Sequence, residues 1–269
     1  MKTRAITGFV FVLVMLAAFF FGPYLFLGFF SLLGLLCLAE FYGLIKTTGI
    51  IPQQINGLVL GGIICAAATS FWLDASFTRY FSGLIVLFGV LIFYAELYRK
   101  SNKPFPQIAF TFLGVVYTLL PFVFFMAMAF LQKTFDYHLP LGFVLLLWTN
   151  DTFAYLSGRQ FGKTKLFERH SPKKTWEGFV GGIIASVIVA FVLSTYFQQV
   201  STFHWIIVSL IISIFGTMSD LVESMLKRSI NVKDSGSVLP GHGGLLDRFD
   251  GLLLAAPLVF IYLYLFSTL

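Results

Sequence analysis

The chain has 269 residues, of which 58% are hydrophobic and only 11% are charged, and its net charge is +6. A soluble domain averages about 25% charged residues, so a water-soluble fold of this length is excluded and the bilayer must be the solvent for most of the chain. Cys37 and Cys65 lie inside apolar runs, where we expect small apolar packing residues and no disulfide.

A membrane-spanning helix needs about 20 predominantly apolar residues. Nine segments meet this requirement: 5–22, 24–45, 57–73, 79–98, 108–131, 139–157, 178–197, 204–226 and 250–269. Lys2 and Arg4 precede the first segment in the manner of a signal peptide, but Gly22-Pro23 leads directly into the next apolar run without a small-residue cleavage site. The predicted fold is therefore all-α, a polytopic integral membrane protein with about nine transmembrane helices, the first of them retained.

The basic residues predict the orientation of these helices. With the N-terminus in the cytoplasm, Arg79 and Lys133 are the 2 of the 18 Lys and Arg that fall outside, which leaves 16 inside. Such an asymmetry is what the positive-inside rule requires. One helix more or fewer would distribute the basic residues over both sides of the membrane, so the asymmetry supports the count of helices. The sequence thus predicts a multi-pass protein of the cell (inner) membrane with a cytoplasmic N-terminus, whose basic excess also attracts anionic lipid and nucleotide.

The distribution of acidic residues predicts which part of the chain is scaffold and which part is catalytic. Residues 1–150 hold 4 of the 12 Asp and Glu, and the remainder holds the other 8. We expect residues 1–138 to form N-terminal scaffold helices and residues 139–269 to form the catalytic helices and cytoplasmic loops of one integral membrane domain. Glu40 and Glu96 lie near helix ends, where we expect a structural role at the cytoplasmic side or between helices.

The first candidate constellation surrounds Asp151, a carboxylate inside an apolar helix. Such a group is costly in the membrane and marks a functional candidate, although packing against a neighbouring helix is the alternative. Tyr155 follows four residues later on the same helix face. Gly158 and Gly162 flank Arg159 and would permit a tight turn beside a phosphate.

The second constellation is the run Ser171-Pro172-Lys173-Lys174-Thr175-Trp176-Glu177-Gly178. Ser followed by Pro predicts a helix start, because Ser caps helices and Pro fits the first helical position. A helix N-terminus with two adjacent lysines predicts an anion clamp at the membrane surface. The alternative is a basic topology anchor that touches only lipid headgroups.

The third constellation lies in and after the last long loop. Asp220, Ser224 or Glu223, and Lys227 share one helix face, whereas Asp247 and Asp250 are three residues apart where a new helix begins. Three carboxylates without cysteine suit a hard divalent ion such as Mg²⁺. The glycine-rich stretch 241–244 lets the backbone approach a phosphate chain. These residue types predict phosphoryl or nucleotidyl transfer, and the alternative is a solvated charged loop. They do not distinguish a kinase from a nucleotidyltransferase or a phosphatase.

A long motif in this third constellation resembles the hallmark of the phosphatidate cytidylyltransferase (CDP-diacylglycerol synthase) family. The motif runs Ser224-x-x-Lys227-Arg228-x4-Lys233-Asp234-x-Gly236-x2-Leu239-Pro240-x-His242-Gly243-Gly244-x-x-Asp247-Arg248-x-Asp250. The first two constellations also resemble segments of that family, whereas Ser219 stands where a small residue, usually Gly, is expected before Asp220.

The resemblance implies an enzyme that joins the cytidylyl group of CTP to phosphatidic acid, giving CDP-diacylglycerol and pyrophosphate, with its active site facing the cytoplasm. It implies Mg²⁺ as cofactor with K⁺ as an optional second cation, a homodimer in the lipid bilayer, and no nucleic-acid partner. The rival readings are another CTP-using lipid enzyme, such as a polyprenol kinase, and a transporter or flippase for an anionic lipid.

The resemblance and the residue chemistry together assign the expected site residues. The catalytic set is Asp220, Lys227, Arg228, Lys233, Asp234, His242, Asp247, Arg248 and Asp250. The substrate- and phosphate-binding set is Asp151, Tyr155, Arg159, Ser171, Lys173, Lys174, Thr175, Glu177, Ser224, Gly243 and Gly244. The expected metal ligands are Asp220, Asp247 and Asp250.

Overall fold

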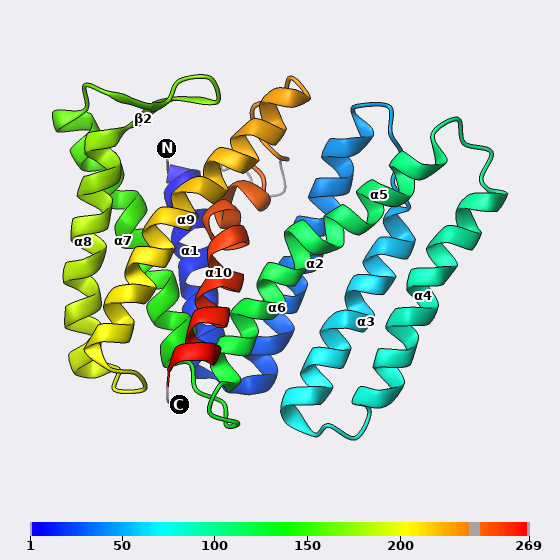
Figure 1. Ribbon diagram of the computed structural model, residues 1–269, viewed down its shortest axis with the longest axis horizontal. Coiled ribbons are helices and arrows are strands. Elements are labelled where there is room, and N and C mark those ends of the chain that lie inside the picture. The colour runs from blue at the N-terminus through cyan, green and yellow to red at the C-terminus, as the bar shows by residue number, and fades with distance from the viewer. Residues whose placement is uncertain (1, 237–242, 268–269) are drawn as a thin grey trace. The chain divides into compact units, whose positions relative to one another are not determined.

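The computed structural model describes residues 2–236 and 243–267, and this part of the chain is almost entirely helical (Figure 1). Eight helices within it are long and apolar enough to cross a membrane. They are α2 (Pro23–Lys46), α3 (Gln54–Leu73), α4 (Thr78–Tyr98), the compound helix Pro104–Phe130, α7 (His138–Phe161), α8 (Trp176–Tyr196), α9 (Thr202–Ser229) and α10 (Leu246–Phe266). A ninth helix, α1 (Lys2–Phe20), contains the shorter apolar stretch Val10–Phe20. The predicted class, a polytopic all-α membrane protein, is confirmed.

The compound helix changes its winding in the middle. It consists of α5 (Pro104–Gly114), a π-helical turn (Val115–Leu119), α6 (Leu120–Ala127) and a short 3₁₀ turn (Met128–Phe130). Pro121 is the second residue after the π-helical turn. Proline has no N–H to donate to the preceding turn, and a wider turn accommodates its ring.

The chain forms two compact units, and neither is continuous in sequence. The first comprises Met1–Val123 and Asp234–Leu246, and the second comprises Phe124–Lys233 and Asp247–Leu269. The loop after α9 therefore belongs to the unit built from the N-terminal helices.

In the first unit, polar groups join helices inside an aromatic and aliphatic core. The Tyr42 hydroxyl donates to the Thr111 carbonyl at 2.7 Å. Gln53 Nε2 donates to Glu96 Oε2 at 2.7 Å, and Arg99 pairs with the same oxygen at 3.0 Å. The predicted interhelical role of Glu96 is thereby confirmed. Cys37 and Cys65 are buried and unbridged in the described part of the chain, as expected.

In the second unit, α7, α8 and α9 pack against one another, and a two-stranded hairpin links α7 to α8. Strands β1 (Lys165–Phe167) and β2 (Ser171–Thr175) are antiparallel, with Lys165 paired to Thr175. Figure 1 shows this hairpin at the end of the unit where α7 and α9 finish and where α8 and α10 begin. Most of the predicted functional residues of the second unit are carried by these four helix ends and the hairpin.

Candidate active site

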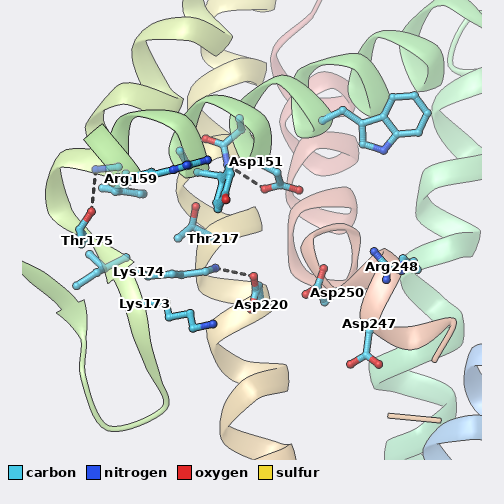
Figure 2. A pocket seen from close by; sticks show the side chains of 18 residues that line it. Asp151, Arg159, Lys173, Lys174, Thr175, Thr217, Asp220, Asp247, Arg248 and Asp250 are labelled. Atoms are coloured by element: carbon cyan, nitrogen blue, oxygen red, sulfur yellow. Dashed lines mark hydrogen bonds and ion pairs between the residues drawn. The ribbon is translucent and has the colours of Figure 1, made fainter. Parts of the chain in front are cut away.

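A cavity of about 540 Å³ lies in the second unit and gathers both acidic and basic side chains. The four carboxylates that line it are Asp151, Asp220, Asp247 and Asp250. The four basic side chains that line it are Arg159, Lys173, Lys174 and Arg248. Residues separated by up to 99 positions in sequence thus meet in one place, as Figure 2 shows.

Asp220 faces the cavity from α9, where its carboxylate meets the basic strand β2. Lys174 Nζ lies 2.6 Å from Asp220 Oδ2 (Figure 2). On the same helix, Ser224 Oγ donates to Asp220 Oδ1 at 3.3 Å. Both partners of the ion pair are about a third exposed, so the pair is open to competition from an incoming anion or cation. The predicted association of Asp220 with Ser224 along one helix face is confirmed.

The start of α10 presents Asp247 and Asp250 to the same cavity, as their spacing predicted. Beside them, the buried Ser219 on α9 bridges two backbone groups of α10. Its hydroxyl donates to the Asp250 carbonyl and accepts from the Leu254 N–H at 3.1 Å. An α-helix normally joins these two groups, four residues apart, directly. Serine in place of the expected glycine therefore ties α9 to α10 at Asp250.

Lys227 on α9 forms ion pairs with two carboxylates. Its Nζ is 2.5 Å from Asp247 Oδ1 and 3.2 Å from Glu223 Oε1. The Glu223 side chain is fully buried and that of Lys227 is 11% exposed. Lys227 does not line the cavity, and its contacts make it a partner that fixes Asp247.

Strand β2 carries the two lysines of the predicted anion clamp, Lys173 and Lys174, and here one sequence prediction is wrong. Ser171-Pro172 does not start a helix, because Ser171–Thr175 is β2 and α8 begins at Trp176. Thr175 is the cap, since its hydroxyl accepts from the Gly178 N–H at 3.2 Å. The strand lets Lys173 and Lys174 reach the cavity from an extended backbone, without a helix N-terminus at Ser171.

Glycines let α7 and α8 pack closely. This role differs from the tight turn beside a phosphate that was predicted for Gly158 and Gly162. Gly158 lies inside α7 and does not form a turn, whereas Gly162 ends that helix. A Cβ at Gly178 would lie 2.6 Å from the Ala154 carbonyl, and one at Gly182 would lie 2.7 Å from Asn150 Oδ1. Small residues at such contacts let membrane helices approach closely. This approach places Asp151 and Arg159 on α7 beside β2.

Several predicted residues are not among those that line the cavity. Among the described residues, those that do not line it are Ser171, Glu177, Ser224, Lys227, Arg228, Lys233, Asp234, Gly243 and Gly244. The Glu177 carboxylate instead accepts from the backbone N–H groups of Lys163 and Thr164 at 3.1 Å each, which fixes the hairpin onto α8. His242 lies outside the described residues.

The sequence reasoning missed other cavity residues. Thr217 on α9 and Trp148 on α7 line it, as does Asn150, which is almost fully buried. Thr217 precedes Asp220 by three residues, so the helical period could have indicated it. Glu223 precedes Lys227 by four residues, but its choice as the buried partner of that lysine depends on packing.

The donor set suits a hard cation that also binds substrate. No group of three His, Cys, Asp or Glu within residues 2–236 and 243–267 is arranged closely enough to enclose a metal ion by itself. Mg²⁺, however, is usually held by one or two carboxylates together with water and substrate phosphates. Four carboxylates around one cavity, with no cysteine among its lining residues, fit that mode.

The fold and this cavity define a class: a polytopic membrane protein whose second unit holds a cavity lined by four carboxylates and four basic side chains. The profile described as the cytidylyltransferase family matches residues 2–266. Phosphatidate cytidylyltransferase of Staphylococcus haemolyticus is 36% identical over 98% of this chain and 99% of its own length. The enzymes of that name from Staphylococcus aureus and Staphylococcus epidermidis are 36% and 35% identical over the same shares. The chain belongs to the cytidylyltransferase family.

Proposed function

We propose that this chain transfers the cytidylyl group of CTP to phosphatidic acid, giving CDP-diacylglycerol and pyrophosphate. The observation that carries the proposal is the cavity that joins four carboxylates to four basic side chains, in a chain whose relatives are named phosphatidate cytidylyltransferases. The product makes the chain an enzyme of phospholipid biosynthesis.

The reaction needs little covalent chemistry from the protein. A phosphate oxygen of phosphatidate forms a bond to the α-phosphorus of CTP, and the bond from that phosphorus to the bridging oxygen of the β-phosphate breaks. Because phosphatidate brings its own anionic nucleophile, the main barrier is repulsion between two anions. Lys173, Lys174, Arg159 and Arg248 line the cavity and would bind and orient the phosphates, which is how phosphoryl transfer enzymes lower such a barrier.

Mg²⁺ would be held by one or two of the expected ligands Asp220, Asp247 and Asp250 together with substrate phosphates, with K⁺ as an optional second cation. When bound, the divalent ion supplies neutralisation of the triphosphate and of the departing pyrophosphate. Lys227 and Ser219 would then act as positioning residues, because one binds the Asp247 carboxylate and the other the Asp250 carbonyl. Lys174 would exchange its partner from Asp220 to a substrate phosphate, which leaves Asp220 available to the cation.

We further propose that the cavity faces the cytoplasm from the inner membrane and that the enzyme works as a homodimer. The orientation is supported by the basic residues, 16 of 18 of which fall on one side when nine helices alternate from a cytoplasmic N-terminus. CTP would arrive from the cytoplasm and phosphatidate from the bilayer. The homodimer is an expectation from the family resemblance, and the mass of the purified protein in detergent tests it.

The direct test uses purified protein, phosphatidate, Mg²⁺ and CTP labelled at one phosphorus. Label at the α-phosphorus should enter the lipid fraction, and label at the γ-phosphorus should leave as pyrophosphate. Chelation should stop both and Mg²⁺ should restore both. Entry of γ label into lipid would instead indicate a kinase, and an absence of CTP-dependent pyrophosphate release would favour transport.

A further inference from the structure

Glu40 is a buried carboxylate in α2 of the first unit and is only 9% exposed. A carboxylate within a membrane helix is costly unless its oxygens are satisfied. Its oxygens accept hydrogen bonds from the loop after α9, which is separated from Glu40 by about 200 residues of chain. The expected interhelical role of Glu40 is thus confirmed in a specific form.

Three donors converge on this carboxylate. The Leu245 N–H donates to Oε1 at 2.9 Å, and the Leu246 N–H donates to Oε2 at 2.8 Å. Ser235, which is buried, donates its hydroxyl to Oε2 at 3.3 Å. Leu246 is the first residue of α10, and the N–H groups at a helix start have no partner within the helix. Glu40 therefore caps α10 from a distant helix, with a charge that also suits the helix dipole.

Two glycines of the family motif close around the same carboxylate. A Cβ at Gly236 would lie 2.7 Å from Glu40 Oε1, and one at Gly244 would lie 2.8 Å from Glu40 Oε2. Both distances are shorter than any real Cβ contact allows. In the structure, Gly236 and Gly244 thus serve the approach of the backbone to Glu40, whereas the sequence alone predicted for Gly244 an approach to phosphate.

We propose that Glu40 is a positioning residue for the reaction, holding the start of α10 so that Asp247 and Asp250 present their carboxylates correctly. Asp247 follows the anchored Leu246 directly, and Asp250 lies one turn further along the same helix. The two N–H groups bind different oxygens, so both oxygens must accept. A carboxylate does this, and a glutamine of the same size would turn one acceptor into an NH₂ donor facing an N–H.

This inference depends on the proposed function, and its test has a readout that needs no substrate. Hydrogen–deuterium exchange of the segment 243–249 is measured in the purified full chain for the wild type, Glu40→Gln and Glu40→Asp. Glu96→Gln is the matched control, because Glu96 is also buried in the same unit and bonds Gln53 and Arg99 instead of the loop. Exchange at Leu245 and Leu246 should rise at least about tenfold in Glu40→Gln, since two amides lose their acceptor.

The kinetic arm separates positioning from a general loss of stability. In Glu40→Gln, kcat should fall at least about tenfold with a smaller rise in KM for phosphatidate, because the displaced start of α10 carries Asp247, Arg248 and Asp250, whereas the other three basic side chains of the cavity keep their places. Glu40→Asp keeps two acceptor oxygens and should recover part of both effects. Gly244→Ala disturbs the same cluster from the loop side, because its Cβ would collide with Ser235 Oγ and lie 2.8 Å from Glu40 Oε2, and it should reproduce the Glu40→Gln pattern even if one variant folds poorly.

Three results would overturn the proposal: unchanged exchange in Glu40→Gln, faster exchange with a normal kcat, or an equal loss of kcat in Glu96→Gln. Because exchange is measured without CTP or lipid, it tests the anchor even if the wild type transfers no label. A failure of the proposed function and a failure of the Glu40 anchor therefore give different results.

Discussion

The hydroxyl of Ser219 on α9 donates to the main-chain carbonyl of Asp250 on α10, and it accepts from the Leu254 N–H at 3.1 Å. Serine at this position departs from the glycine that the family motif leads one to expect. One side chain thereby connects the two helices that present Asp220 and Asp250 to the cavity.

Ser219→Ala should lower kcat about tenfold with a small change in stability. The helical bond from the Leu254 N–H to the Asp250 carbonyl would keep both backbone groups satisfied, but Asp250 loses its tie to α9, and small misplacements of catalytic groups are costly. Transfer of α-labelled CTP to lipid measures the effect. Ser213→Ala is the matched control, because Ser213 is a buried α9 serine whose hydroxyl has no hydrogen-bond partner among the described residues. Equal kcat in Ser219→Ala and the wild type would remove Ser219 from the positioning role.

Asp247→Asn should reduce turnover at least about 100-fold, because the cavity loses a carboxylate that lines it and that Lys227 holds in place. Membrane insertion and yield should be unchanged. The measurement is label transfer as a function of Mg²⁺ concentration. Asp74→Asn, at an exposed position after α3, serves as the control for the same chemical change. Normal rates in Asp247→Asn would exclude Asp247 from cation binding.

Lys227→Met should decrease the free energy of unfolding by about 3 kcal/mol, because it leaves the fully buried Glu223 carboxylate without its partner. Adding Glu223→Gln should recover part of that loss by removing the buried charge. Denaturant unfolding in detergent micelles measures both. If the double variant were as unstable as the sum of the two single variants, Glu223 and Lys227 would not be coupled.

Gly178→Ala should cost about 1–3 kcal/mol of stability, because its Cβ would lie 2.6 Å from the Ala154 carbonyl. Activity should fall as well, since α7 and α8 carry residues that line the cavity. Gly89→Ala is the control, because a Cβ there meets no described atom within 4 Å and alanine favours a helix over glycine. Thermal unfolding of the two variants should therefore shift in different ways, and equal shifts would contradict the close helix contact.

Cysteine labelling tests the proposed orientation. In a Cys37→Ala/Cys65→Ala background, Gln132→Cys places a thiol between the compound helix and α7, and Arg169→Cys places one in the hairpin beside the cavity. Both original side chains are exposed. A membrane-impermeant maleimide should label Gln132→Cys in intact cells and should label Arg169→Cys only after permeabilisation. The reverse pattern would turn the cavity toward the outside.

The sequence by itself determined the class of fold, the membrane spans and the eight charged residues that line the cavity, although it also put forward residues that do not line it. Spans follow from the length and hydropathy of local segments, which explains why predicted and observed helix ends mostly differ by only a few residues. The local spacing of Asp247 and Asp250 likewise placed both at the start of one helix. Where the local signal was ambiguous it misled, since Ser171-Pro172 resembles a helix start and lies in a strand.

Tertiary structure decided which groups bind one another. Sequence spacing gave no reason to pair Lys174 with Asp220 or Ser219 with Asp250, or to join Glu40 to amides 205 and 206 residues away. The buried groups Ser219 and Glu40 are paired because an unpaired hydroxyl or charge in an apolar surrounding costs free energy, and the packing of the helices determines which partner is within reach. Glycines at the helix contacts set that packing, and only the folded chain shows what each one approaches.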